Sequence, residues 1–260
     1  MRHTRRRFLL LSVSLLLISA LIAGCGGDDS DSETLPKAED LLDDAVDNLE
    51  SASSFQVKIG VTGYPVIIEV GGLGLPAEAG LAFKYASGVF AAPDSLQASV
   101  EFSVGDLMAA AELIAIGRDQ YLQMDMLTGS RWLNQELIQG FSPSSLLSTE
   151  TGIPYTLRNV SGLEMAGKRD LDGLAVYLLT GKVQATDVNA LTFGLINTQS
   201  GELDIEIYVL TEEHLVEQIV LREPLPAQAQ DEEQEPTTWT INITHYNEPV
   251  EISAPATEEN

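Results

Sequence analysis

The chain has few basic residues, few histidines and a single cysteine. Lysine and arginine together number 14 against 39 aspartates and glutamates, which gives a formal net charge of −25. Phosphate backbones repel such an acidic surface, so we expect no nucleic-acid partner. One cysteine cannot form a disulfide within the chain. Burial of an apolar core must therefore stabilise the folded part.

The histidines offer little for catalysis or metal binding. His3 lies near the start of the chain, His214 follows Glu212 and Glu213 in a turn, and His245 ends an apolar strand pattern. None has a second histidine at metal-ligand spacing, so we expect no metal site and no cofactor. A Ser-His-acid triad around His214 is the enzymatic alternative, but a solvated turn histidine fits the surrounding sequence better. We expect no catalytic activity.

The first 25 residues have the composition of an export signal. Four arginines precede an apolar run at residues 8–22, and two small residues, Ala23 and Gly24, lead to Cys25. The run is short for a membrane span, so residues 1–24 are predicted to be a secretory signal peptide that is removed. The sequence TRRRFL fits a twin-arginine motif and the leucine-rich core fits the general secretory route, so both routes remain open.

The sequence Ile-Ala-Gly-Cys at residues 22–25 resembles the lipobox of bacterial lipoproteins. The resemblance implies that the chain is cut before Cys25 and that the Cys25 sulfur is the lipid attachment site, carrying diacylglycerol. Two acyl chains give stable anchoring, because each buried CH₂ contributes about 0.8 kcal/mol. The protein is then extracytoplasmic and held at the bacterial cell membrane. An ordinary signal peptide followed by a chance cysteine is the alternative.

The chain after the predicted cleavage site is more acidic still. Four of the basic residues and none of the acidic ones precede Cys25, which leaves a formal charge of −29 on 236 residues, enough for one large β domain or two small ones. Residues 25–36 are predicted to be the lipidated cysteine and a polar tether. Residues 37–53 place apolar side chains at helical spacing opposite acidic ones, which predicts an amphipathic helix.

From Phe55 onward the apolar period changes to two. The alternation is clear at residues 55–62, 96–104, 203–209 and 239–243, and less regular strands are predicted at residues 66–70, 81–85, 112–116, 120–126, 157–163, 175–180 and 215–221. Closely spaced turn signals join most of them as hairpins. The pattern predicts a mainly β fold of about ten or eleven antiparallel strands with few helices (α+β).

Two further helical stretches and one long loop are predicted. Residues 142–147 begin with serine and proline before a leucine pair, and residues 186–191 form another short turn. The acidic, proline-rich residues 223–236 separate two strands that would otherwise pair, so they are predicted to be a long hairpin loop.

Ten strands make a sheet roughly 48 Å wide, whereas three short helices cover roughly 30 Å of it. The sheet must therefore curl, find a second sheet, or leave apolar surface that a ligand fills. Apolar residues on the alternating faces are the candidates for lining a lipid cavity, although the period does not say which face is concave. They are Val57, Ile59, Val100, Phe102, Ile205, Ile207, Ile241 and Ile243.

Residues 141–188 and 239–255 resemble the LppX/LprAFG family of envelope lipoproteins, and residues 41–62 are similar to the start of its domain. The resemblance is carried by the order of short pieces behind a lipobox and covers residues 37–255. The pieces are Pro143-Ser144 before a leucine pair, Gly152, Asn159, Gly167, Asp170 with the Asp172-Gly173 turn, Gly181-Lys182-Val183, and Asp187-Val188.

The resemblance implies a single LolA/LolB-like domain at residues 37–255, followed by a tail at 256–260. The implied fold is a curled antiparallel half-barrel with helices over its concave face. The implied function is binding of acylated lipid or glycolipid in a hydrophobic cavity and its carriage within the cell envelope, with the membrane and an envelope transporter as partners. Glycine-rich residues 70–80 and the acidic loop depart from the family pattern. The alternative is a non-catalytic envelope scaffold or adhesion module that binds a protein partner.

Overall fold

The computed structural model describes residues 35–68, 80–105, 107–196, 201–225 and 234–256. They belong to one compact unit, Leu35–Asn260. Cys25 and the predicted signal peptide lie outside the described residues, as do most of the predicted tether, nearly all of the glycine-rich segment and the centre of the acidic loop. The predicted division of the chain at residues 24, 36 and 255 stays a prediction.

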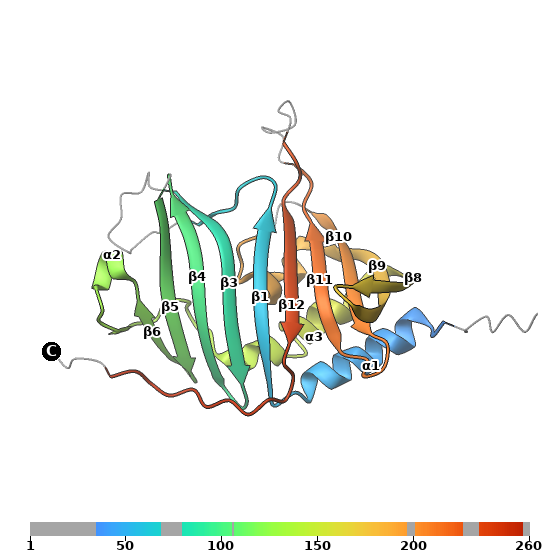
Figure 1. Ribbon diagram of the computed structural model, residues 1–260, viewed down its shortest axis with the longest axis horizontal. Coiled ribbons are helices and arrows are strands. Elements are labelled where there is room, and N and C mark those ends of the chain that lie inside the picture. The colour runs from blue at the N-terminus through green and yellow to red at the C-terminus, as the bar shows by residue number, and fades with distance from the viewer. Residues whose placement is uncertain (1–34, 69–79, 106, 197–200, 226–233, 257–260) are drawn as a thin grey trace, which may run out of the picture. The chain divides into compact units, whose positions relative to one another are not determined.

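Twelve strands in the described part of the chain form one antiparallel sheet (Figure 1). Their order across the sheet is β7-β6-β5-β4-β3-β1-β12-β11-β10-β9-β8, with β2 beside β3. The strands are β1 (Ser54–Thr62), β2 (Ile67–Ile68), β3 (Leu81–Ala91), β4 (Ser95–Val104), β5 (Leu107–Ile116), β6 (Asp119–Gln123), β7 (Leu133–Asn134), β8 (Ser161–Leu171), β9 (Leu174–Gln184), β10 (Glu202–Leu210), β11 (Val216–Arg222) and β12 (Thr238–Thr244).

The sheet is open, because β7 and β8 stand at its two ends and do not pair with each other within the described residues. Chain neighbours pair as hairpins on either side of the centre, and the first and last strands, β1 and β12, meet in the middle. The predicted long loop joins β11 to β12, which pair as expected. The predicted mainly β, antiparallel fold is therefore confirmed, with the two-residue strand β7 as the one addition.

Helices α1 and α3 lie over one face of the sheet, and α2 lies beside its β5–β6 end (Figure 1). The structure has six helical segments in its described part. They are α1 (Ala38–Glu50), α2 (Asp125–Thr128), η1 (Pro143–Leu147), α3 (Ile153–Arg158), η2 (Ala185–Asp187) and α4 (Asn189–Thr192), η marking a 3₁₀ helix. The buried side of α1 carries the apolar residues that the sequence pattern selects, Ala38, Leu41, Leu42, Ala45, Val46 and Leu49. This helix contacts α3, β11 and the terminal strand β8.

The strand predicted over residues 157–163 is wrong in its first half. Residues 153–158 form α3, and the strand β8 begins only at Ser161 and continues to Leu171. Proline in the first turn of α3 lacks a backbone N–H, but donors in that turn have no partner within the helix, so proline favours helix initiation despite the apolar and polar alternation. Similarly, the strand predicted over residues 120–126 ends at Gln123 and gives way to α2.

The core has two parts. A large apolar cluster lies between the helices and strands β1, β3 and β9 to β12, and includes the fully buried Trp239. Its indole N–H donates to Glu223 Oε1 at 2.7 Å, which satisfies the ring's polar group. A smaller cluster on β3 to β6 and the residue before α2 consists of Leu81, Phe102, Ala111, Leu122 and Met124.

Candidate functional site

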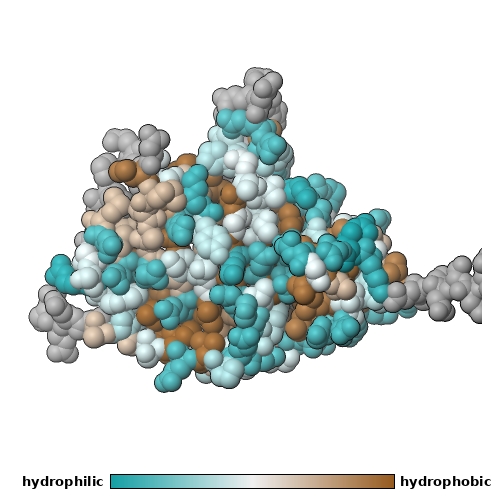
Figure 2. All heavy atoms as spheres, in the orientation of Figure 1, coloured by the Kyte–Doolittle hydropathy of each residue, from teal (hydrophilic) through white to brown (hydrophobic). Residues whose placement is uncertain are grey.

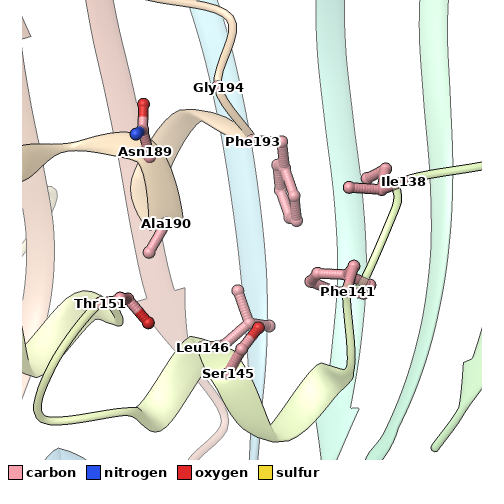
Figure 3. A pocket seen from close by; sticks show the side chains of 9 residues that line it. All are labelled: Ile138, Phe141, Ser145, Leu146, Thr151, Asn189, Ala190, Phe193 and Gly194. Carbon is pink, nitrogen blue, oxygen red and sulfur yellow. The ribbon is translucent and has the colours of Figure 1, made fainter. Parts of the chain in front are cut away.

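The candidate site is a cavity of about 470 Å³ within the layer of helices and loops that covers the sheet (Figure 3). The segments that form it are the loop before η1, η1 itself, the end of the loop before α3, and α4 with the turn that follows it. Its lining residues are Ile138, Phe141, Ser145, Leu146, Thr151, Asn189, Ala190, Phe193 and Gly194.

The lining combines apolar side chains with a few uncharged polar ones. Phe141 and Phe193 approach each other edge to face, with ring centroids 6.4 Å apart, and Leu146 lies below them in Figure 3. Ser145, Thr151 and Asn189 contribute hydroxyl and amide groups, and no charged side chain is among the nine lining residues. An apolar cavity with few polar groups suits an uncharged or mainly apolar ligand.

One wall of the cavity is held by the side chain of Gln120 on β6. This amide is 96% buried, and its Oε1 accepts hydrogen bonds from the backbone N–H groups of Leu137 and Ile138, both at 2.9 Å. Its Nε2 donates to the Ile138 carbonyl, also at 2.9 Å. Three hydrogen bonds from one rigid strand therefore fix the backbone at the point where Ile138 enters the cavity lining.

A carboxylate holds the beginning of η1 in the same way. Asp94 lies in the turn between β3 and β4, and its Oδ1 accepts hydrogen bonds from the Ser142 hydroxyl at 2.7 Å and the Ser144 backbone N–H at 2.6 Å. Bonds from N–H or O–H groups to an ionised acceptor are short and stronger than neutral ones. Phe141 and Ser145, on either side of this contact, are thereby positioned in the lining.

The opposite wall depends on a left-handed turn after α4. Phe193 has φ 50° and Gly194 has φ 74°, so the chain reverses where Phe193 enters the cavity. A positive φ is uncommon for phenylalanine, whereas glycine adopts it without cost. The Thr156 hydroxyl of α3 donates to the Asp187 carbonyl at 2.5 Å and so links this wall to the helix α3.

The eight residues that were proposed from sequence as cavity lining all lie on the inner face of the sheet, which the helices cover. Six belong to the large apolar cluster, Phe102 belongs to the smaller one, and the half-buried Val100 packs against both. None is among the nine residues that line the 470 Å³ cavity. Contact of Val57, Ile59, Val100, Phe102, Ile205, Ile207, Ile241 or Ile243 with lipid stays a prediction.

Sequence reasoning missed the residues that do line the cavity. Ile138 and Phe141 stand in a stretch with no apolar period, and Ala190 and Phe193 belong to a helix of only four residues and the turn after it. The available signals were the proline-led start of η1 and the Phe-Gly pair at residues 193–194, each of which marks a change of chain direction.

The titratable groups of the described residues lie outside the cavity. His214, in the β10–β11 turn as predicted, has its Nδ1 3.1 Å from Asp44 Oδ2 and links that turn to α1. Burial raises the pKa of Tyr246, whose hydroxyl donates to the Val216 carbonyl at 2.7 Å. Within the part of the chain that the structure describes, no group of three or more His, Cys, Asp or Glu side chains is placed to hold a metal ion.

No helix among the described residues has the length and apolar character needed to cross a membrane.

An open antiparallel sheet with helices over one face and an apolar cavity in the helical layer defines a half-barrel protein. The crystal structures that share this fold include two lipoproteins. LprF from Mycobacterium bovis is 17% identical with a TM-score of 0.60, over 84% of this chain and 97% of LprF. The lipoprotein LppX of Mycobacterium tuberculosis is 18% identical with a TM-score of 0.52, over 83% of this chain and 99% of LppX.

The chain belongs to the LppX_LprAFG lipoprotein family, whose model matches residues 37–252. A further relative is the lipoarabinomannan carrier protein LprG of Mycobacterium tuberculosis, 24% identical over 193 residues, which are 73% of this chain and 74% of LprG. The family resemblance inferred from sequence is therefore confirmed.

Proposed function

We propose that this protein is a membrane-anchored carrier that binds acylated lipid or glycolipid and moves it within the cell envelope. The observation that carries the proposal is the cavity of about 470 Å³, which is lined without charged side chains. It is supported by the family of the chain and by its similarity to a named lipoarabinomannan carrier. The volume lies in the range of roughly 300–1,000 Å³ that is usual for ligand pockets.

The chemistry required is exchange of apolar surface rather than catalysis. An acyl chain that leaves a bilayer for a protein cavity keeps its apolar surface out of water, at about 25 cal/mol for each Å² that remains buried. The free energies of the two bound states are then similar, and exchange is reversible. Gln120 and Asp94 hold one wall of the cavity to the sheet, so we propose that the opposite wall, the four-residue helix α4 and its turn at Phe193 and Gly194, moves to admit a longer acyl chain.

The same proposal includes the attachment at Cys25. Acylation there, with residues 26–36 as tether, places the domain outside the cytoplasm and next to the bilayer that supplies or receives the lipid. We propose an envelope transporter as the partner on the other side of the exchange.

The test is the lipid content of the purified protein. Residues 26–260, expressed without the signal segment and purified without detergent, are extracted with organic solvent and analysed by mass spectrometry. We expect about one acylated lipid per chain. A protein that folds with a cooperative thermal transition and releases no lipid would contradict the proposal.

A scaffold or adhesion module is the second candidate, because the inner face beside α1 is filled by side chains. Ile205, Ile207, Ile241 and Ile243 are all at least 99% buried in the large cluster. A wholly filled interior would leave no room for lipid, so the absence of extractable lipid together with capture of an envelope protein would favour this function.

A further inference from the structure

The four most exposed large apolar side chains among the described residues lie near the strand ends at which β4 turns into β5. They are Ile67 (52% exposed), Leu107 (69%), Met108 (62%) and Met126 (57%), and we call them the apolar tip. Figure 2 shows apolar colours over the upper parts of β4 and β5, where this end of the sheet lies. Scattered exposed apolar residues are normal, but a gathered set marks an interaction surface.

Strand register places these residues together. Ile67 of β2 pairs with Ala82, Ala82 with Ser103, and Ser103 with Met108, so Ile67 and Met108 lie in one row across four strands. Directly paired residues point to the same face, which makes this row uncharged from end to end. Met126 belongs to α2, which contacts β5.

The apolar tip has side chains on both faces of the sheet. Leu107 precedes Met108 in β5, and successive residues of a strand point to opposite faces. On the face that carries Ser103 and Met108, the next row contains the charged Glu101, paired with Ala110. An apolar end that is bordered by charge matches the change from acyl chains to headgroups in a bilayer.

We propose that the apolar tip inserts into the bilayer and docks the domain on lipid. The inner side of the tip continues into the small cluster of Leu81, Phe102, Ala111, Leu122 and Met124, which lines the sheet behind it. Docking there gives an acyl chain an apolar path from the membrane onto the inner face of the sheet. This role rests on the proposed carrier function, whereas the docking itself rests only on the proposed attachment at Cys25.

The reach of the tether supports a bilayer as the occupant. Ten residue steps separate Cys25 from the first described residue, Leu35, and they span at most about 36 Å when extended. The 10 residues of β5 span about 34 Å, so the tether matches the height of the sheet. The tether is as long as the strands, so its reach does not depend on how far along the strands α1 begins. A domain anchored through Cys25 can therefore bring the apolar tip to the membrane.

Charge argues against a second copy as the occupant. Each chain carries a formal charge of −25, so two copies repel each other. A phosphatidylcholine surface has no net charge and accepts the uncharged row without an electrostatic cost.

The test uses the full chain in phosphatidylcholine vesicles whose acyl chains carry nitroxide quenchers. A polarity-sensitive fluorophore is attached through Met108→Cys, and the dye-treated parent chain gives the blank because Cys25 is the only native cysteine. The matched control is Leu174→Cys, an apolar position that is 43% exposed at the β8–β9 turn, at the opposite end of the sheet. We expect several-fold stronger quenching at position 108 than at position 174.

Adding Leu107→Ser and Met126→Ser to the Met108→Cys chain should reduce quenching to the level at position 174. Each apolar side chain withdrawn from lipid lowers the ratio of docked to undocked protein by about tenfold. The melting temperature should be unchanged because these side chains are exposed; if it falls, Leu107→Gln with Met126→Gln repeats the test with longer side chains.

Equal quenching at positions 108 and 174, or quenching that the serine substitutions leave intact, would overturn the inference. So would self-association in vesicle-free solution that depends on Leu107 and Met126 while quenching is absent. Quenching without extractable lipid would contradict the carrier function and support the docking. Extractable lipid without quenching would support the carrier function and contradict the docking.

Discussion

At the scale of the single residue, the buried amide of Gln120 has the largest consequence for the cavity. Replacing it by leucine keeps the volume but leaves the N–H groups of Leu137 and Ile138 without their acceptor. We expect the free energy of unfolding to fall by about 1–3 kcal/mol, the usual cost of an unsatisfied buried group. Urea denaturation measures the loss, and hydrogen exchange at the two amides should accelerate.

The matched control for Gln120→Leu is Gln139→Leu, which changes an exposed glutamine in the same loop. It should leave both the unfolding free energy and the exchange of Leu137 and Ile138 unchanged. If Gln120→Leu behaved like this control, the amide would not hold the cavity wall.

Glu217 in β11 gives a prediction about pH. Burial raises the pKa of this carboxyl from its ordinary value of 4.5, with a smaller opposing effect of His245. Folding therefore favours the protonated acid, and stability is lost as the pH rises through the raised pKa. We expect Glu217→Gln to increase the unfolding free energy at pH 7, relative to the parent, by more than it does at pH 4.

Chemical denaturation at the two pH values checks the Glu217 prediction. Glu212→Gln, an exposed change in the adjoining turn, should give the same small difference from the parent at both. A benefit of Glu217→Gln that did not grow between pH 4 and pH 7 would contradict burial as the cause.

At the scale of the element, α4 and the core strands respond differently to added volume. Ala190→Trp in α4 places its side chain in the cavity, so lipid uptake should fall while the melting temperature changes little. Ile241→Trp in β12 enters a site with no exposed surface, and overpacking should cost about 1–3 kcal/mol or more. Thermal unfolding and lipid extraction separate the two effects.

Ala254→Trp, at an exposed position in the C-terminal segment, is the control for the size of tryptophan and should change neither quantity. If Ala190→Trp left lipid uptake intact, the ligand would occupy a place other than the cavity described here.

Elements with a sustained apolar period were predictable from sequence, and the others were not. The helix α1 and the strands β1, β4, β10 and β12 each bury one face against a large partner, so their pattern is imposed by burial along the whole element. The helix α3 has only six residues and α4 only four, too few to repeat a period of 3.6. Because the cavity is built from these short elements, its lining was not predictable from the pattern.

At the scale of the whole molecule, the net charge makes stability depend on salt. A formal charge of −25 repels itself more in the compact state than in the unfolded chain. Raising NaCl from 10 to 100 mM shortens the screening length from about 30 Å to about 10 Å, so we expect the melting temperature to rise. A melting temperature that fell over this range would mean that specific ion pairs, such as Arg222–Glu206, outweigh the net repulsion.

The family and its fold could be predicted from the chain because both depend on features spread over its whole length. Alternation of apolar residues and frequent turns define the antiparallel sheet, and the order of short motifs around Pro143 and Asp172 indicates the family. The apolar tip was not predictable, since it needs the register that brings Ile67 and Met108 into one row.

The two edge strands β7 and β8 do not pair with each other within the described residues, which has a consequence for the size of the cargo. A closed tube would admit only molecules narrower than its bore, and each would have to be threaded from one end. A ligand can enter and leave an open sheet from the side. On the carrier proposal, a sugar headgroup of any size therefore stays in solvent while the acyl chains are bound. The acyl chains alone then determine which lipids bind.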